Sequence, residues 1–75
     1  MTLQNCDLKK YCKITKVDID NEKLKLRLYE VGFFVGARVM VLNKSCFKQT
    51  LLVKVLDSCF AIKSNMAESI EVEYE

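Results

Sequence analysis

The chain has 75 residues, of which 51% are hydrophobic and 29% charged, and its net charge is +2. This mixture excludes intrinsic disorder, which requires low hydrophobicity and high net charge, and the length allows one small domain over residues 1–75. No apolar run reaches the roughly 18–20 residues of a membrane span. The first residues lack the basic start and apolar core of a signal peptide, so we expect a cytosolic protein with no membrane insertion.

The small net charge hides an asymmetry along the chain. Residues 1–63 contain all twelve basic residues and carry a net charge of +6, whereas residues 64–75 carry −4. We expect the acidic end to pair with lysines of a neighbouring strand. A solvated face explains the remaining positive charge better than a nucleic-acid site, because sheet-based single-strand binders also expose aromatic side chains for base stacking. The three tyrosines and four phenylalanines of this chain are mostly needed inside.

The first expected element is a strand within residues 8–19. Cys12 and Ile14 fall on one of its faces, and Val17 joins that face only if a β-bulge intervenes. Asp20 or Asn21 then provides the side chain that caps the start of a helix.

A helix is predicted over residues 22–31, because its apolar residues recur with helical spacing along one narrow stripe. These residues are Leu24, Leu28 and Val31. Gly32 stands where a helix ends in a left-handed residue, and Gly36, the second of the chain's two glycines, follows four residues later. The two glycines therefore predict a corner at which the helix turns into a strand.

Three strands in a meander are expected after this corner. Their bounds are residues 37–43, 50–56 and 59–63, with a loop at 45–49 and a tight turn at Asp57-Ser58. In the second of these strands Leu51, Val53 and Val55 share the inner face. Leu52 and Leu56 share the outer face with Lys54, and Phe60 and Ile62 of the third strand pair with the inner residues.

One short helical turn at residues 64–67, begun by Ser64 or Asn65, leads into the last strand. In that strand Ile70, Val72 and Tyr74 alternate with Glu71, Glu73 and Glu75, which is typical of a half-buried strand. Five short strands are too few for a sandwich, and closing them into a barrel removes exposed edges. The predicted fold is mainly β: a small SH3-like barrel with one helix between its first two strands.

In order and spacing these residues resemble the FeoA family, the small cytosolic partners of the bacterial ferrous-iron transporter FeoB. The family pattern is arginine-leucine, three residues, glycine, a hydrophobic residue, two residues and a second glycine before a strand. Here it is filled by Arg27, Leu28, Gly32, Phe33 and Gly36. Further on, residues 60–63 match a family strand loosely. Ala67, Ile70 and Val72 match a second family pattern in register, so the resemblance spans residues 8–74.

The chain departs from the family pattern in its loops. Val35 stands where the family often has proline, and residues 45–49 replace a loop that contains proline and glycine. The family also commonly has a glycine near the hairpin that Asp57 and Ser58 make here. Because loops carry recognition, these departures affect the expected partner more than the expected fold.

The residues predict neither a metal site nor a cofactor. Histidine is absent, and the four cysteines contain no CxxC pair. They are Cys6, Cys12, Cys46 and Cys59. We interpret them as free thiols of a reducing compartment, with Cys12 a small buried hydrophobe. The three glutamates of the last strand are better explained as a solvated face than as a cation site.

Catalysis is not predicted either. A nucleophilic cysteine needs a neighbouring base, and no histidine is present to serve as one. The chain also lacks a glycine-rich loop that cradles phosphate. We therefore expect a protein that is not an enzyme.

Protein recognition is the class of function that remains. Phe33, Phe34 and Val35 place three bulky apolar groups in one turn, and Phe33 is expected to fill the barrel beneath the helix. Phe34 and Val35 are then exposed, and adjacent exposed apolar groups mark interaction surfaces. The further candidates for partner binding are Phe47, Leu52 and Leu56. The alternative, that the helix or the amino-terminal segment covers these groups, stays open.

The resemblance implies a non-enzymatic accessory protein of ferrous-iron uptake that docks on the cytosolic domains of a FeoB-like transporter. A second hypothesis is a stand-alone SH3-like regulatory domain, related to the carboxyl-terminal domain of DtxR-type iron-dependent repressors, that binds a protein or peptide. Self-association through the same surface is equally allowed. Nucleic-acid binding is the third and least favoured hypothesis.

Overall fold

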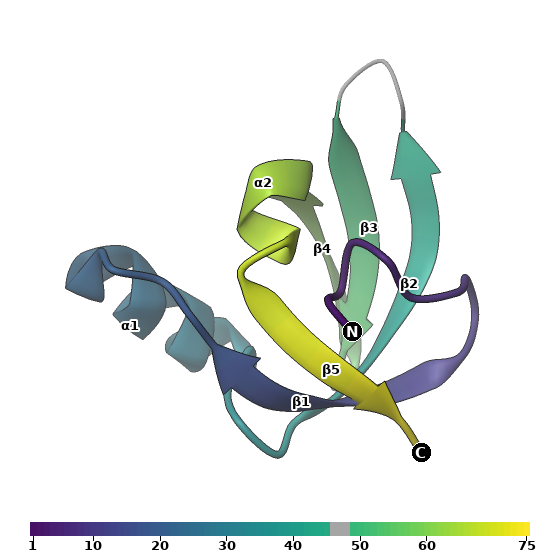
Figure 1. Ribbon diagram of the computed structural model, residues 1–75, viewed down its shortest axis with the longest axis horizontal. Helices are drawn as coiled ribbons and strands as arrows, with labels where there is room; N and C mark the ends of the chain where they lie inside the picture. The colour runs from purple at the N-terminus through teal and green to yellow at the C-terminus, as the bar shows by residue number, and fades with distance from the viewer. Residues whose placement is uncertain (46–48) are drawn as a thin grey trace.

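The computed structural model describes residues 1–45 and 49–75 and contains one five-stranded antiparallel sheet with two helices. The elements are β1 (Tyr11–Val17), α1 (Glu22–Val31), β2 (Arg38–Ser45), β3 (Thr50–Val55), β4 (Ser58–Lys63), α2 (Ser64–Ala67) and β5 (Ile70–Tyr74). The strand order is β4-β3-β2-β1-β5, and β1 and β5 cross in front of the other three strands (Figure 1). The predicted mainly β fold, the helix and the short helical turn are confirmed.

Alternate residues of the strands fill the interior, as the period-two pattern predicts. The fully or almost fully buried side chains include Cys12, Ile14, Val39, Val41, Leu51, Val53, Val55, Ile70 and Val72. Phe33 fills the barrel beneath α1, and its ring meets the Phe60 ring edge-on at 6.5 Å between centroids. Among the described residues no polar or charged side chain is buried, so apolar packing accounts for the core.

A β-bulge in β1 brings Val17 into the core. The register between β1 and β5 shifts between Ile14 and Lys16, after which Val17 lies opposite Ile70. Val17 is buried as a result. The predicted bulge is confirmed.

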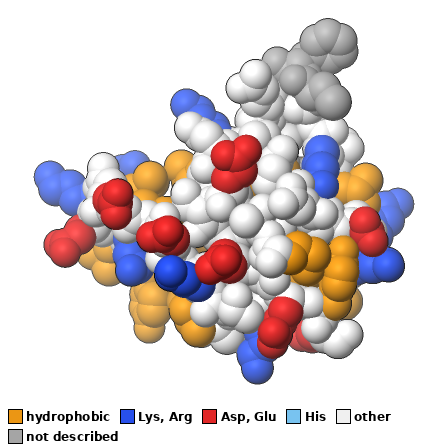
Figure 2. Space-filling model, in the orientation of Figure 1, with side chains coloured by type: hydrophobic (Ala, Val, Ile, Leu, Met, Phe, Trp, Pro, Cys, Tyr) orange, Lys and Arg blue, Asp and Glu red, His pale blue; other side chains and the backbone are white. Residues whose placement is uncertain are grey.

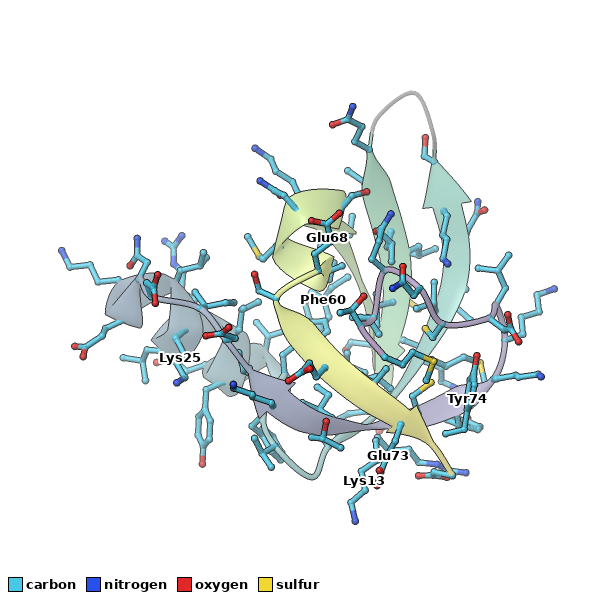
Figure 3. The ribbon with its side chains drawn as sticks, in the orientation of Figure 1. Lys13, Lys25, Phe60, Glu68, Glu73 and Tyr74 are labelled. Carbon is cyan, nitrogen blue, oxygen red and sulfur yellow. The ribbon has the colours of Figure 1, made fainter. Side chains whose placement is uncertain are left out.

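The acidic last strand pairs with the lysines of β1. Lys13 lies opposite Glu73, and Lys16 lies opposite Glu71. In Figure 3 the labelled Lys13 and Glu73 lie close together near the crossing of these two strands. The prediction that the acidic strand lies beside lysines of a neighbouring strand is therefore confirmed.

The amino-terminal segment belongs to the fold, which the sequence did not predict. Its backbone pairs with the outer side of β5: the Leu3 N–H donates to the Ile70 carbonyl at 2.8 Å, and the Val72 N–H donates to the Met1 carbonyl at 2.7 Å. The side chains of Leu3 and Cys6 are completely buried. Lys44 holds the segment from the other side, since its Nζ donates to the carbonyl oxygens of Gln4 and Cys6, each at 2.8 Å.

The hairpin between β3 and β4 turns one residue earlier than predicted. Val55 pairs with Ser58, so Leu56 and Asp57 form the two-residue turn in place of Asp57-Ser58. Alternation along the strands cannot distinguish these two registers, because both place Phe60 opposite an inward residue. The observed register gives Leu56 a left-handed backbone with φ +56°.

Helix α1 begins and ends as its sequence predicts. The Asn21 side chain caps the first turn, since its Oδ1 accepts from the Lys23 and Leu24 N–H groups at 3.1 and 3.2 Å. Gly32 ends the helix with φ +121°, and its N–H returns to the Leu28 carbonyl at 3.0 Å. A Cβ at Gly32 would lie only 2.5 Å from Val55 Cγ1. Glycine is therefore required here both by its backbone angle and by the approach of β3.

Gly36 completes the corner by forming a β-turn with residues 34–37. The Ala37 N–H donates to the Phe34 carbonyl at 3.0 Å, and Gly36 at the third position has φ +93°, as a type II turn requires. Val35 occupies the second position, at the apex of the turn. The predicted corner at the two glycines is thus confirmed as two separate left-handed residues.

Substitution of alanine at the two glycines is expected to give different losses of stability. Gly36→Ala meets nothing within 4 Å and lowers the free energy of unfolding by about 1–2 kcal/mol, the cost of a left-handed residue with a Cβ. Gly32→Ala carries that cost and also forces Val55 to move, so it lowers the same quantity by about 3 kcal/mol or more. Urea unfolding of both variants checks the order. Equal losses would show that Val55 gives way freely.

Candidate docking surface

An open groove lies where α1 meets β1 and the 34–37 turn. Its volume is about 500 Å³, and we call it the corner groove. It is lined by Thr15, Lys16, Val17, Lys25, Tyr29, Phe33, Phe34 and Val35. Its apolar wall comes from the residues after the helix, because Gly32 turns the chain and places them against the side of α1. Figure 2 shows hydrophobic side chains exposed beneath α1 on this side of the molecule.

Two of the predicted docking residues lie in this groove with different exposure. Val35 is 63% exposed, which follows from its place at the apex of the turn. Phe34 is only half-buried and packs against the core, with its ring centroid 5.3 Å from that of Tyr29. The expectation that Phe34 is exposed is therefore wrong in part, because the aromatic ring of α1 covers it. Tyr29, which the sequence did not single out, takes its place as an exposed group of this surface.

The two other described candidates, Leu52 and Leu56, lie on β3 and in the turn after it. Leu52 is 39% exposed on the outer face of the sheet, and Leu56 is 68% exposed. A left-handed leucine is unfavourable by about 1–2 kcal/mol relative to glycine at this place in a two-residue hairpin. Leu56 approaches the end of α1, since its Cδ1 is 3.5 Å from where a Gly32 Cβ would lie. Phe47 and Cys46 lie outside the described residues.

The described cysteines differ in exposure and in the pKa of their thiols. Cys6 and Cys12 are free and buried, and Cys59 is free and exposed. Burial raises the pKa of the Cys12 thiol from 9.0 to about 11, with a further contribution from the Cys6 thiol beside it. Burial also raises the pKa of Cys6. Both buried thiols are therefore protonated at neutral pH, and thiols in that form are poor nucleophiles and poor metal ligands.

Neither a metal cluster nor a membrane-spanning helix is found in the part of the chain that the structure describes. Within residues 1–45 and 49–75, no group of three or more Cys, Asp or Glu side chains is arranged to hold a metal ion. No helix in this part of the chain is long and apolar enough to cross a membrane. The described residues thus offer surfaces for binding: an apolar groove at the corner, and exposed leucines on and beside β3.

A small barrel with a corner helix, apolar surface groups and no assembled catalytic cluster among the described residues is typical of an accessory binding domain. The sequence matches the FeoA domain family over residues 1–74. The chain therefore belongs to the FeoA family. No curated protein matches it.

Solved structures agree with this assignment. The FeoA protein of Stenotrophomonas maltophilia, described as an SH3 domain protein in complex with zinc, is 29% identical with a TM-score of 0.81. That match covers 97% of this chain and 89% of the relative. The FeoA protein of Chlorobium tepidum is 23% identical with a TM-score of 0.89, covering 99% of this chain and 70% of that one. The predicted SH3-like fold is confirmed.

The same fold is found within metal-dependent repressors. A manganese-dependent transcriptional repressor is 16% identical with a TM-score of 0.88, and the match covers all of this chain but 41% of the repressor. At this identity the likeness concerns the fold alone. The observed fold thus agrees with the expected relation to repressor domains. It assigns no repressor activity to this chain.

Loss of stability at high pH is expected from the buried Cys12 thiol. The unfolded chain releases this proton near pH 9.0 and the folded chain near pH 11, so the stabilisation is complete below pH 9 and decreases as the pH rises towards 11. The free energy of unfolding, measured with urea across this pH range, should therefore fall more steeply for the native chain than for Cys12→Ala. Cys59→Ala is the control and should follow the native curve. Equal slopes in all three would show that Cys12 does not contribute.

Substitution of Leu56 tests the strain in the hairpin. Asparagine tolerates the left-handed region better than leucine, so Leu56→Asn should leave the free energy of unfolding unchanged or raise it by up to about 1 kcal/mol. Leu52→Asn is the matched control, because Leu52 has an ordinary extended backbone and loses packing without relief of strain. It should be destabilised. A comparable destabilisation of both variants would contradict the assignment of strain to Leu56.

Proposed function

We propose that this protein is a non-enzymatic, cytosolic accessory factor of ferrous-iron uptake, which docks its barrel on the cytosolic part of a FeoB-like transporter. Membership of the FeoA family supports a role in ferrous-iron uptake. The Stenotrophomonas relative is itself described as a candidate activating factor of ferrous-iron transport. The observation that carries the docking mode is the exposure of Val35 at the apex of the glycine corner.

The corner is built to present this side chain in a fixed position. The Gly36 N–H donates to the Ile14 carbonyl at 2.8 Å, and the Ile14 N–H donates to the Ala37 carbonyl at 2.9 Å. These bonds tie Gly36 and Ala37, the last two residues of the turn, to β1. A surface group that is already held in place loses little entropy when a partner binds.

The groove beside Val35 gives a partner a place to bury apolar surface. Tyr29 lines this groove from α1 and Phe34 lines it from the turn, and the centroids of the two rings are 5.3 Å apart. Exposed tyrosines are enriched at the centres of protein interfaces. The proposed contact is therefore a bulky apolar residue of the transporter placed between α1 and the turn.

Binding to the purified cytosolic domain of the transporter tests this proposal. Val35→Asp should weaken binding at least about tenfold, since it places a charge in an apolar contact. Leu26→Asp is the matched control: Leu26 is similarly exposed on α1 at 59% but does not line the groove. It should bind like the native chain. Both variants change exposed residues, so circular dichroism should show both folded.

Two results would contradict the proposal. Failure of the native chain to bind the transporter domain would remove the proposed function. Equal binding of Val35→Asp and the native chain would leave the partner but exclude the corner groove. Phe34→Asp is the less suitable variant, because its half-buried ring contributes to the core.

A further inference from the structure

The outer face of β2, β3 and β4 carries a second surface, which we call the basic sheet face. It consists of Met40, Leu52, Lys54, Cys59, Ala61 and Lys63. Lys54 lies between Met40 and Cys59 in one row of paired residues, and Leu52 lies between Asn43 and Ala61 in the next. Side chains in such rows are neighbours about 5 Å apart, so the face is continuous.

All formal charges in these three strands are positive. Residues 38–45, 50–55 and 58–63 contain four basic residues and neither Asp nor Glu. Arg38 is engaged elsewhere, since its Nε donates to Glu75 at 2.8 Å and its guanidinium stacks on Tyr11 at 3.7 Å. Lys54 and Lys63 form no ion pair with any residue that the structure describes. The glutamates of β5 lie beside other lysines, since Glu71 and Glu73 are opposite Lys16 and Lys13 of β1.

The apolar part of this face is Leu52 with the small side chains of Cys59 and Ala61 beside it. Cys59 and Ala61 are exposed on β4, which is the last strand at this side of the sheet. Their small size leaves one side of Leu52 open at the level of the sheet. A bulky side chain of a partner can therefore contact Leu52 while its neighbours reach Lys54 and Lys63.

We propose that the basic sheet face binds an acidic protein segment that carries a bulky apolar side chain. The carboxylates of the segment pair with Lys54 and Lys63, and its apolar group packs on Leu52. This inference rests on the proposed docking function and names the chemistry of a second contact with the partner. Phosphate-rich nucleic acid fits less well, because no outward side chain of β2, β3 or β4 is aromatic and able to stack on a base.

A synthetic peptide tests the proposal without the transporter. The probe is a short peptide of glutamates around two leucines, and its matched controls carry lysine for every glutamate or alanine for both leucines. Titration followed by amide chemical shifts should show binding of the acidic leucine peptide, with the largest shifts at Leu52, Lys54 and Ala61. Its affinity should exceed that of either control about tenfold and should fall with added salt.

Charge reversal identifies the face. Lys54→Glu with Lys63→Glu should weaken the acidic peptide about tenfold and favour the lysine peptide instead. The matched control is Lys23→Glu with Arg27→Glu on α1, which makes the same change in net charge at exposed residues outside the corner groove. It should bind the acidic peptide like the native chain. Leu52→Ala, which removes the apolar contact, should also weaken binding of the peptide.

Each other outcome overturns the proposal. These outcomes are no binding at millimolar peptide, equal affinity for all three peptides, shifts confined to the corner groove, an effect of the α1 pair equal to that of the sheet pair, or tighter binding of a DNA oligonucleotide. The transporter domain gives a separate result. If the native chain does not bind that domain but binds the peptide as described, the proposed function fails and this inference stands.

Discussion

The close approach of Gly32 to Val55 fixes the geometry on which the rest of the molecule depends. Because no Cβ intervenes, the end of α1 meets the end of β3 directly. This contact sends Phe33 into the barrel, brings Leu56 beside the helix end and starts the turn that exposes Val35. One backbone position therefore determines both an element of the core and the side chains offered to a partner.

Most of the fold could be predicted because its signals are local or periodic. Alternation defined the inward residues of β3 and β5, and the narrow stripe with Gly32 defined α1 within its observed bounds. Even the bulge before Val17 could be inferred, since an apolar residue out of phase needs one extra residue to reach the core. The amino-terminal segment gave no such signal. Leu3 and Cys6 are isolated apolar residues whose burial depends on β5, about seventy residues away in the sequence.

The surfaces were predicted less completely than the core. The exposure of Val35 follows from the position before Gly36 in a turn, so the sequence contained it. The sequence did not predict that Tyr29 partly covers Phe34. The rotation of α1 about its axis decides which helix residue contacts the Phe34 ring, and that rotation depends on tertiary packing. The strain at Leu56 was also invisible, since either of two registers satisfied the alternation of β3 and β4. The lack of acidic residues in β2, β3 and β4 stood in the sequence, but only the strand pairing shows that Lys54 and Lys63 share a face.

The pairing of the first residues with β5 has a consequence for synthesis. Met1 and Leu3 are synthesised well before their hydrogen-bond partners Val72 and Ile70, because most of the 75-residue sequence lies between them. β1 also pairs with β5 on one of its two sides, so that side stays unpaired until β5 has been made. Such long sequence separation slows folding, because the pairings with β5 form only after the rest of the sheet has been synthesised. A nascent chain that stalls before residue 70 therefore exposes the groups that β5 would cover, and quality-control proteases and chaperones have time to recognise it.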